Sequence, residues 1–359
     1  MSKRCLIIAE AGVNHNGRSD LAFELIDAAV EAKADAIKFQ TFKASNLVTN
    51  NAAKAQYQQQ TTNSKETQYD MLKRLELPYD LHYELIEHCN EKGIRFLSTA
   101  FDHESLIFLT KDLGLTTLKI PSGEITNAPL LLEHAYTGSN LIVSTGMANL
   151  GEIEESLGVI AFGLLGSENP SRESFKAAYV SIDGQKKLKE KVSLLHCTTE
   201  YPAPLNEINL NVIKTLECAF GLPVGYSDHS AGITVPIAAA ALGSVIIEKH
   251  FTLDKSLPGP DHKASLEPVE LSQMVCAIRD VETALGKSIK GPTYSEVNNL
   301  EMARKSLVAA MTINADEKFT KDNLAIKRPG GGVSPMNYWD MLGLISERDY
   351  AKDDVISYR

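Results

Sequence analysis

The sequence predicts an α/β fold in which a (β/α)8 barrel is followed by a smaller second domain. Eight short runs rich in β-branched residues alternate with segments of helical periodicity, which is typical of parallel βα units. All eight units lie before residue 287 of the 359-residue chain, and this length suits such a barrel. A doubly wound sheet of eight parallel strands is the alternative, but the number of units within this length favours the barrel.

The eight expected strands are short, and most of them end in polar or turn-forming residues. In chain order they are Cys5–Gly12, Ala36–Thr41, Arg95–Phe101, Thr117–Gly123, Leu141–Gly146, Val192–Thr198, Pro223–His229 and Ser244–Phe251.

Helical patterns follow these strands. The first, Ser19–Ala34, carries Leu21 and Leu25 at helical spacing, and its serine is the expected N-cap. The last, Pro268–Leu285, ends at Gly286, a residue type that favours helix C-caps.

Two connections are longer than the others. Residues 42–78 follow a strand, so they should lie over the C-terminal mouth of the barrel and help to shape a site. Residues 166–191 precede a strand, so they should lie at the opposite end.

The change of pattern after the last helix predicts the domain boundaries. We expect a barrel domain over residues 1–286, a linker over 287–294 and a second domain over 295–359, with short strands at Ser306–Thr312 and Leu324–Lys327. A domain of 65 residues has a small core, so we expect it to dock on the barrel or on a partner subunit.

The composition excludes several classes of protein. The chain has 36 Lys or Arg against 46 Asp or Glu residues, and this net charge of −10 argues against nucleic acid as a partner. Five scattered cysteines without a C-x-x-C pair indicate neither a disulfide framework nor a zinc knuckle. The longest apolar stretch, Val235–Ile247, is shorter than the roughly 18 residues that span a bilayer. We therefore expect a soluble cytoplasmic protein that does not bind membranes.

The charge is divided unevenly along the chain. From Lys287 onward there are 11 Lys or Arg and 10 Asp or Glu residues, so this part carries +1 and the preceding part −11. By net charge alone, the acidic barrel argues against an anionic substrate.

Polar residues of unusual kinds collect at the ends of the strands, where barrel enzymes hold their active sites. Lys38 and Lys119 lie inside strands, and a buried lysine without an anion costs several kcal/mol. Together with nearby hydroxyl groups they can hold a phosphate and a carboxylate. These hydroxyl groups belong to Thr99, Ser122, Ser144 and Ser227. Neither a P-loop nor a strand-linked G-x-G-x-x-G is present, so a nucleotide is not indicated.

Two histidines form a possible metal site. Residues two apart on a strand share a face, so Glu248 points the same way as His250, and Ser227 the same way as His229. Neighbouring strands lie about 4.8 Å apart, which would let both histidines reach one ion. A single histidine at a strand end is more often structural, but two at matching heights favour a site. Histidine ligands without thiolates suit Mn²⁺ or Mg²⁺ better than structural zinc.

Taken together, the motifs resemble those of the sialic acid synthases, also called N-acylneuraminate or nonulosonate synthases. The likeness covers nearly the whole chain, in the motifs AEAGVNHNG, IKFQTF, FLSTAF, LKIPSGE, STGM, HCTTEYPAP, VGYSDHS, IEKHFTLDKSLPGPDHKASLEP and KRPGGGVSPM. The resemblance implies a (β/α)8 TIM barrel followed by a small antifreeze-like (SAF) domain. It also implies a domain-swapped homodimer in which each small domain covers the partner's barrel mouth.

The resemblance further implies a reaction. Phosphoenolpyruvate (PEP) would attack the metal-polarised aldehyde of open-chain N-acetylmannosamine through its C3. Water would then add at C2 and phosphate would leave, giving N-acetylneuraminate. The alternative substrate is 2,4-diacetamido-2,4,6-trideoxymannose, which would give N,N'-diacetyllegionaminate. The implied cofactor is a divalent metal, Mn²⁺ before Mg²⁺ or Co²⁺.

The family's functional positions can be matched to this sequence one by one. The implied PEP site is Lys38, Thr99, Lys119, Ser122, Ser144 and Ser227, and the implied metal ligands are His229 and His250. The implied sugar contacts are Gln40, Tyr201 and Asp261, with Arg328 reaching from the second domain to the acyl group. Glu10 and Glu124 match carboxylates that move protons or orient water, and Lys38 and Lys119 count with them as catalytic.

The sequence departs from the family pattern at two positions. Thr199 stands where some members have asparagine, and Met302 lies near the position of an aromatic sugar contact.

Two other functions compete with this interpretation. One is a Schiff-base pyruvate aldolase in which Lys119 or Lys38 is the amine nucleophile. The other is a carbohydrate-binding or ice-binding module with a decayed barrel, which the intact polar set at the strand ends argues against.

Overall fold

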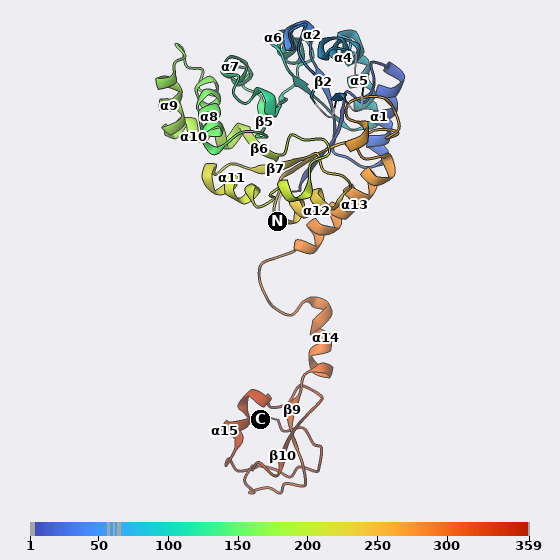
Figure 1. Cartoon of the computed structure of the whole chain (residues 1–359). Helices are drawn as coiled ribbons and strands as arrows, with labels where there is room; N and C mark the ends of the chain where they lie inside the picture. Colours follow the sequence, from blue (N-terminus) through green and yellow to red (C-terminus); the bar gives the residue numbers. More distant parts are fainter. Residues whose placement is uncertain (1–3, 56–57, 60–61, 63–65, 358–359) are drawn as a thin grey trace. The chain divides into compact units, whose positions relative to one another are not determined.

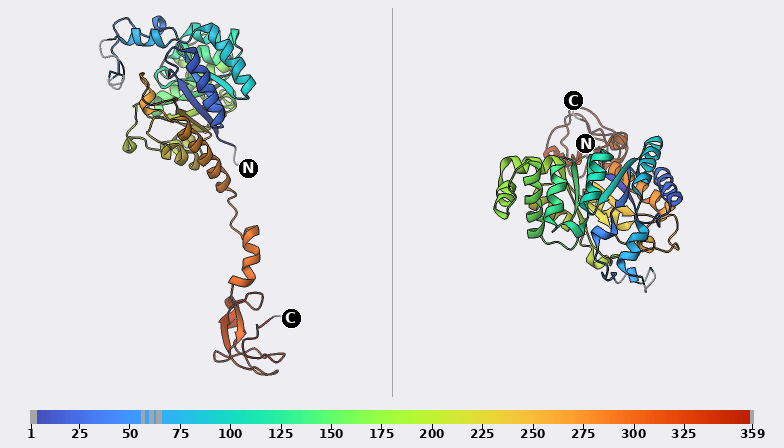
Figure 2. Two further views of the ribbon diagram at one scale, coloured as in Figure 1. Left: turned by 90° about the vertical axis from the view of Figure 1, so that its right-hand side faces the viewer. Right: turned by 90° about the horizontal axis from the view of Figure 1, so that it is seen from above.

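The computed structural model describes residues 4–55, 58–59, 62 and 66–357. The chain divides into two compact units, residues 1–286 and 287–359, and each is described by itself (Figure 1). In the first unit eight parallel strands close into a barrel in the order β1 to β8, with helices around them (Figure 2). The predicted barrel is therefore confirmed.

All eight expected strands are present. They are β1 Leu6–Gly12, β2 Ala36–Thr41, β3 Arg95–Ala100, β4 Thr117–Ile120, β5 Asn140–Ser144, β6 Val192–Cys197, β7 Val224–Asp228 and β8 Ile246–His250. Strand β4 ends three residues earlier than expected, because Pro121 has no N–H group to continue the ladder. Ser122–Glu124 instead form a 3₁₀ helix, η2.

The helices of the first unit occupy the connections between strands. The α-helices are α1 Ser19–Glu31, α2 Ala44–Leu47, α4 Gln68–Leu75, α5 Tyr79–Lys92, α6 His103–Ile107, α7 Ala128–Tyr136, α8 Leu150–Leu164, α9 Arg172–Val180, α10 Ile182–Lys191, α11 Val212–Phe220, α12 Thr234–Ala241 and α13 Pro268–Leu285. The short helices are η1 Phe108–Asp112, η3 Leu205–Glu207 and η4 His262–Ala264.

The expected serine cap of the first helix is wrong. Ser19 is already the first helical residue of α1, and the N-cap is Arg18, which makes no side-chain capping hydrogen bond. Positive φ angles at Asn16 and Gly17 form the turn immediately before it, so the chain enters the helix one residue early. The expected end of the last helix is confirmed, since α13 stops at Leu285 and Gly286 caps it with φ 52°.

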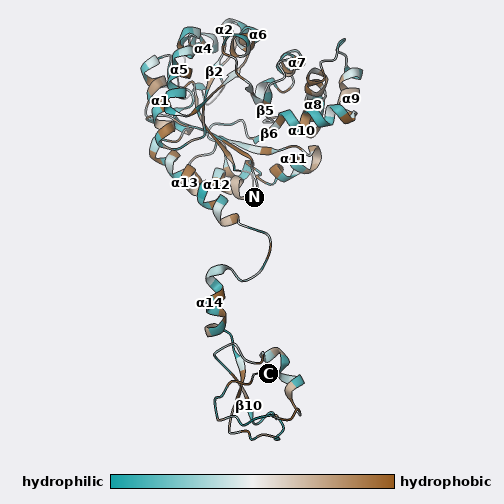
Figure 3. Cartoon of the chain, turned by 180° about the vertical axis from the view of Figure 1, so that it is seen from behind, coloured by the Kyte–Doolittle hydropathy of each residue, from teal (hydrophilic) through white to brown (hydrophobic). Residues whose placement is uncertain are grey.

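An apolar layer fills the inside of the barrel below the strand ends. Its residues are Ile8, Ala36, Leu97, Ile142, Leu195 and Ile246. A Cβ at Gly225 would lie 2.6 Å from Leu195 Cδ2 and 2.5 Å from the Ile246 carbonyl oxygen, so only glycine fits there. The strands are largely hydrophobic, whereas the surrounding helices alternate between hydrophobic and hydrophilic residues (Figure 3).

A buried ion pair joins the last two strands on their outer side. Lys249 Nζ lies 2.6 Å from Asp228 Oδ2, and both side chains are fully buried. Asp228 Oδ1 also accepts hydrogen bonds from the Tyr226 hydroxyl and the Ser230 N–H. These bonds hold the ends of β7 and β8 together.

The second unit contains helix α14 (Tyr294–Ala303), an antiparallel pair of strands, β9 (Ser306–Ala309) and β10 (Leu324–Lys327), and the short helices η5 (Pro335–Asn337) and α15 (Tyr338–Met341). Strand β9 ends three residues before the expected Thr312. The core of this unit is small and includes Leu307, Ile313, Phe319 and Tyr350. In the described part of the chain, no helix combines the length and the apolar character needed to cross a membrane.

His134 on α7 should make the first unit sensitive to acid. Its Nδ1–H donates to the Leu130 carbonyl at 2.8 Å, and burial lowers its pKa from 6.5 to about 4. Between pH 6.5 and about 4, His134 is protonated in the unfolded chain but neutral in the folded chain. The free energy of unfolding therefore falls as the pH falls through this range. Urea titrations give the free energy of unfolding of wild type and of His134→Leu at each pH. When the pH is lowered from 7.5 to 5, the difference between the two should change by about 2 kcal/mol in favour of His134→Leu. An equal difference at both pH values would contradict the assignment.

Candidate active site

The C-terminal ends of the barrel strands surround a cavity of about 410 Å³. Every sequence-predicted site residue of the first unit lines it: Glu10, Lys38, Gln40, Thr99, Lys119, Ser122, Glu124, Ser144, Tyr201, Ser227, His229, His250 and Asp261. Arg328 belongs to the second unit, where its Nε–H donates to the Ala303 carbonyl at 3.0 Å. The structure therefore gathers the predicted barrel residues in one place.

A buried cluster of opposite charges lies at the bottom of this cavity. Lys38 Nζ lies 2.6 Å from Glu10 Oε2 and 3.6 Å from Glu248 Oε2, and it donates to Thr99 Oγ1 at 3.0 Å. Lys119 Nζ lies 3.2 Å from Glu248 Oε1. The charged side chains are at most 5% exposed, so solvent screens these interactions little.

The strand register explains why these groups meet. Glu10 on β1 is paired with Lys38 on β2, and Thr99 on β3 is paired with Lys119 on β4. All four point into the barrel, one step along the strands above the apolar layer.

The cluster shifts the pKa values of its members. Burial raises the pKa of Glu10 to about 7, against the attraction of Lys38. Burial also acts on Glu248, but Lys119 and Lys38 outweigh it and hold that pKa below its usual value. Lys38 keeps its proton, because Glu10 and Glu248 raise its pKa more than burial lowers it. Near neutral pH, Glu10 can therefore gain or lose a proton.

Glu248 is a charged cavity residue that the sequence placed on the face of His250 but to which it assigned no role. It contacts both lysines and accepts a hydrogen bond from the Ser227 hydroxyl at 2.8 Å. The available signal was its position two residues before His250 on the same strand face. Its lysine partners are more than 100 residues away in sequence, so their proximity needed the fold.

Hydroxyl groups line the side of the cavity next to Lys119. Ser144 Oγ is buried and has no hydrogen-bond partner among the described residues. Ser122 Oγ accepts from the Gly146 N–H at 3.0 Å. A Cβ at Gly146 would lie 2.4 Å from Thr199 Oγ1 and 2.7 Å from Ser122 Oγ, so glycine is required for these groups to converge. This side can offer several donors to an anion.

His229 and His250 face each other at the mouth, with ring centroids 5.5 Å apart. His229 Nδ1 lies 2.7 Å from the Thr198 carbonyl oxygen and must carry its hydrogen there, which leaves Nε2 as the nitrogen that accepts from the Tyr201 hydroxyl at 2.9 Å. Burial lowers the pKa of His250 well below 6.5, and its Nδ1 has no hydrogen-bond partner among the described residues.

These two imidazoles fit the predicted divalent metal, because His250 Nδ1 has no hydrogen-bond partner among the described residues and His229 Nε2 could bind an ion in place of the Tyr201 hydroxyl. No group of three or more His, Cys, Asp or Glu side chains within the described ranges is arranged as a metal cluster. Water and substrate would therefore complete the coordination of such an ion.

Two further carboxylates stand nearer the rim. Asp261 Oδ2 lies 3.9 Å from His250 Nδ1, and burial raises the pKa of Asp261 to about 6. Glu124 is half-buried on η2 and accepts from Asn127 Nδ2 at 2.7 Å. Gln40 donates to Glu10 Oε1 at 3.3 Å, so it joins the rim to the buried cluster.

The long connection after β2 forms an apolar wall of the cavity, as its position predicted. We define this apolar wall as Phe42, Leu47, Val48, Met71 and Leu72, from α2, α4 and the adjoining loop. Gln58 and Gln68 add amide groups to the same side. Residues 56–57, 60–61 and 63–65 of this connection lie outside the described part.

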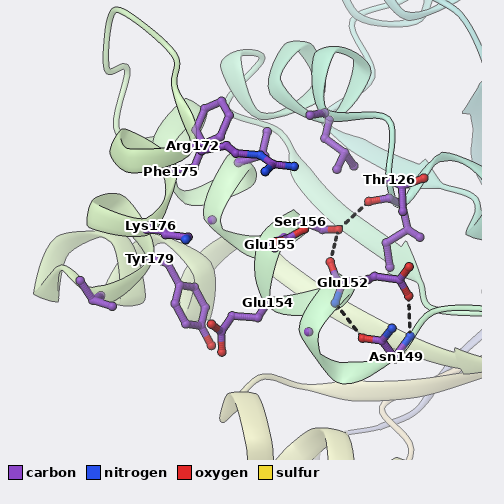
Figure 4. Close-up of a pocket in the computed structure, with 17 residues that line it drawn as sticks. Thr126, Asn149, Glu152, Glu154, Glu155, Ser156, Arg172, Phe175, Lys176 and Tyr179 are labelled. Carbon is purple, nitrogen blue, oxygen red and sulfur yellow. Dashed lines mark hydrogen bonds between the residues drawn. The ribbon is translucent and has the colours of Figure 1, made fainter.

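A larger hollow of about 810 Å³ lies elsewhere, between α7, α8 and α9 (Figure 4). The connection 166–191 contributes to it through Arg172, Phe175 and Tyr179. None of the sequence-predicted site residues lines this hollow. The chemistry therefore belongs to the smaller cavity at the strand ends.

Sequence comparison agrees with the fold and the cavity. The profile of the NeuB family matches residues 25–290, and that of the SAF domain matches residues 304–358. The chain belongs to the NeuB family. It is 49% identical to an N,N'-diacetyllegionaminic acid synthase of Campylobacter jejuni over 99% of each chain. It is 45% identical to a synthase of the same name from Legionella pneumophila, over 95% of this chain and 90% of that one.

More distant relatives include an N-acetylneuraminate-9-phosphate synthase of Homo sapiens, 32% identical over 98% of this chain and 91% of that one. Among solved structures, an N-acetylneuraminic acid (sialic acid) synthetase from Leptospira borgpetersenii is 35% identical with a TM-score of 0.66. That match covers 83% of this chain and 90% of the other. The resemblance inferred from the motifs is thus confirmed, and so are the TIM barrel and the SAF domain.

Replacing Lys38 tests the buried cluster. Lys38→Met leaves Glu10 without its closest cation, and breaking a buried ion pair from one side costs about 3–5 kcal/mol. Urea denaturation at pH 7.5 should show this loss, and the double variant Lys38→Met, Glu10→Gln should recover part of it. Equal stability of wild type and the single variant would mean that the pair is not formed in solution.

Proposed function

We propose that this protein condenses PEP with an open-chain N-acylated aminosugar and water, giving a nine-carbon 2-keto acid and inorganic phosphate. In this reaction C3 of PEP forms a bond to the aldehyde carbon, water adds at C2, and the C2–O bond to phosphate breaks. The observation that carries the proposal is the pair of buried lysines beside the hydroxyl-lined wall. When Glu10 takes up a proton, which its pKa of about 7 allows, the two ammonium groups face one carboxylate, and this suits a small, strongly anionic substrate.

The lysines and hydroxyls would hold PEP. Lys38 and Lys119 are kept in place by Glu10 and Glu248, so they lose little conformational freedom when the substrate arrives. Since the Ser144 hydroxyl has no partner within the described ranges, it can donate to a phosphate or carboxylate oxygen without breaking a bond seen there. Thr99, Ser122 and Ser227 complete the proposed PEP site.

Two carboxylates would accept and donate the protons of the reaction. The pKa of Glu10, near 7, lets its side chain accept or donate a proton at neutral pH. Glu124 lies at the rim, where it could take a proton from the attacking water. We propose Glu10 and Glu124 for these two roles.

A divalent ion on His229 and His250 would polarise the aldehyde oxygen of the sugar and so make its carbon a better electrophile. We propose Mn²⁺ first, with Mg²⁺ or Co²⁺ as alternatives. Gln40, Tyr201 and Asp261 also line the cavity and would bind the sugar hydroxyls or acyl group.

The preferred sugar is proposed to be 2,4-diacetamido-2,4,6-trideoxymannose, which makes N,N'-diacetyllegionaminate the product. The names of the two relatives at 49% and 45% identity support this choice over N-acetylmannosamine, our first expectation from sequence. The apolar wall supports it too, because the trideoxy sugar has a methyl group at C6 where N-acetylmannosamine has a hydroxyl. Burying that hydroxyl against apolar side chains would cost free energy. N-acetylmannosamine remains the second candidate.

We also propose a homodimer in which Arg328 of one protomer completes the sugar site of its partner. The guanidinium is exposed in the second unit, and the same unit exposes Trp339 and Met336, whose apolar surface a docking partner would cover.

The aldolase alternative is less compatible with the cavity. A Schiff-base lysine must be deprotonated to attack a carbonyl, whereas the carboxylates around Lys38 raise its pKa. Lys119 is also ion-paired, with Glu248.

Product analysis tests the function and the sugar. The purified chain with Mn²⁺, PEP and either sugar should release phosphate only when both substrates are present. Mass spectrometry should show the diacetyllegionaminate product, with kcat/KM at least tenfold above that for N-acetylmannosamine. A higher kcat/KM for N-acetylmannosamine would overturn the choice of sugar. Trapping of a pyruvate adduct by borohydride, without phosphate release, would replace the synthase with the aldolase.

Metal binding gives a readout that does not depend on turnover. Titration of the EDTA-treated protein with Mn²⁺, followed by electron paramagnetic resonance, should show one bound ion per chain and should raise the melting temperature. His250→Ala should lose both effects and all turnover but keep its fold. His103→Ala, which removes an exposed histidine, is the matched control and should behave as wild type. Full activity in metal-depleted buffer would contradict the assignment.

A further inference from the structure

Asp261 lies on a loop that is anchored beside the cavity. The Thr252 N–H donates to the Leu266 carbonyl at 2.8 Å, and the Leu266 N–H donates to the His250 carbonyl at 2.9 Å. These bonds close the base of the loop directly after β8. Asp261 is 7% exposed and lines the cavity, so the conformation of this loop sets where its carboxylate stands.

A side-chain relay from the loop after β1 reaches the backbone of Asp261. The amide group of Asn14 donates one hydrogen to the Phe251 carbonyl at 2.8 Å and the other to Ser265 Oγ at 2.9 Å. Ser265 then donates its own hydrogen to the Asp261 carbonyl at 2.7 Å. Asn14 and Ser265 are both buried, so the relay is protected from water.

A second relay fixes the residue that follows Asp261. His262 is fully buried, and burial lowers its pKa to about 4, so the ring is neutral. Asn16 Oδ1 can only accept, so His262 Nε2 carries the hydrogen of their 3.2 Å bond. His262 Nδ1 therefore accepts from the Thr252 hydroxyl at 2.7 Å.

The two loops pack too closely to move independently. A Cβ at Gly259 would lie 2.6 Å from His262 Cδ2 and 2.9 Å from Asn16 Oδ1. Asn16 itself has φ 53°, a left-handed conformation that asparagine tolerates better than most residues. The close contact therefore depends on both residue types.

We propose that Asn14, Asn16, Thr252, His262 and Ser265 are positioning residues for Asp261 and so for the aminosugar. None of them lines the cavity, so they act on the substrate through the loop. Their hydrogen bonds reach the backbone of Asp261 or its neighbours and leave the carboxylate to face the cavity. This inference rests on the proposed function and adds residues that hold the sugar side of the site but not the PEP side.

Two variants break one relay each. Ser265→Ala removes the hydroxyl between Asn14 and Asp261. Asn16→Gly removes the acceptor of His262 at a backbone conformation that glycine adopts readily. Ser265→Ala loses two buried hydrogen bonds and Asn16→Gly loses one that is partly buried, so the KM for the aminosugar should rise at least about threefold while the KM for PEP stays within twofold.

Matched controls separate positioning from general damage. Asn16→Asp keeps an acceptor oxygen for His262, so its KM for the aminosugar should equal that of the wild-type protein. Ser256→Ala alters an exposed side chain of the same loop outside both relays and should leave both KM values unchanged. If Ser265→Ala fails to fold, as judged by its melting curve, the KM values of Asn16→Gly alone test the proposal.

The outcomes distinguish this inference from the proposed function. An unchanged sugar KM in a folded Asn16→Gly variant, or equal rises in both KM values, would overturn the inference while wild-type activity still supports the synthase. Failure of the wild-type protein to release phosphate with either sugar would overturn both.

Discussion

The ion cluster of Glu10, Lys38, Lys119 and Glu248 is the constraint on which the rest of the barrel mouth depends. Two carboxylates and two ammonium groups balance one another where water is nearly excluded, and none of them is tolerable there alone. Each comes from a different strand, so the cluster forms only if all four strands keep their register. The apolar layer beneath it and the ion pair between β7 and β8 maintain that register.

The cluster resolves the conflict between an acidic chain and an anionic substrate. Net charge is carried mainly by exposed side chains, whereas the field inside a narrow cavity depends on its nearest groups. Lys38 and Lys119 are already desolvated and oriented before a ligand arrives, and the hydroxyl of Ser144 adds a donor that none of the described residues engages. The part of the site that would bind the anion is therefore in place before the substrate arrives. On the sugar side, the loops after β1 and β8 hold Asp261 through side-chain relays.

The sequence predicted the barrel and thirteen of the residues around its cavity, because parallel strands end at one edge and residues two apart share a face. Glu248 was assigned no role, because its role comes from ion pairs with two lysines that only the closed barrel brings close to it. The buried pair of Lys249 and Asp228 was missed for the same reason. The apolar wall depends on how α2 and α4 fold back over the mouth, which periodicity does not define. Within the barrel, the error at Ser19 was local, because the preceding turn decides where a helix begins.

The central claim is that the buried lysines form a binding site for PEP, and calorimetric titration with PEP alone tests it most directly. The wild-type protein should bind one PEP per chain, and Lys119→Gln should weaken the affinity at least tenfold, since a charge-assisted contact contributes about 1.5–3 kcal/mol. Ser256→Ala should bind as wild type does. Equal affinity of wild type and Lys119→Gln for PEP, or no binding to either, would contradict the account.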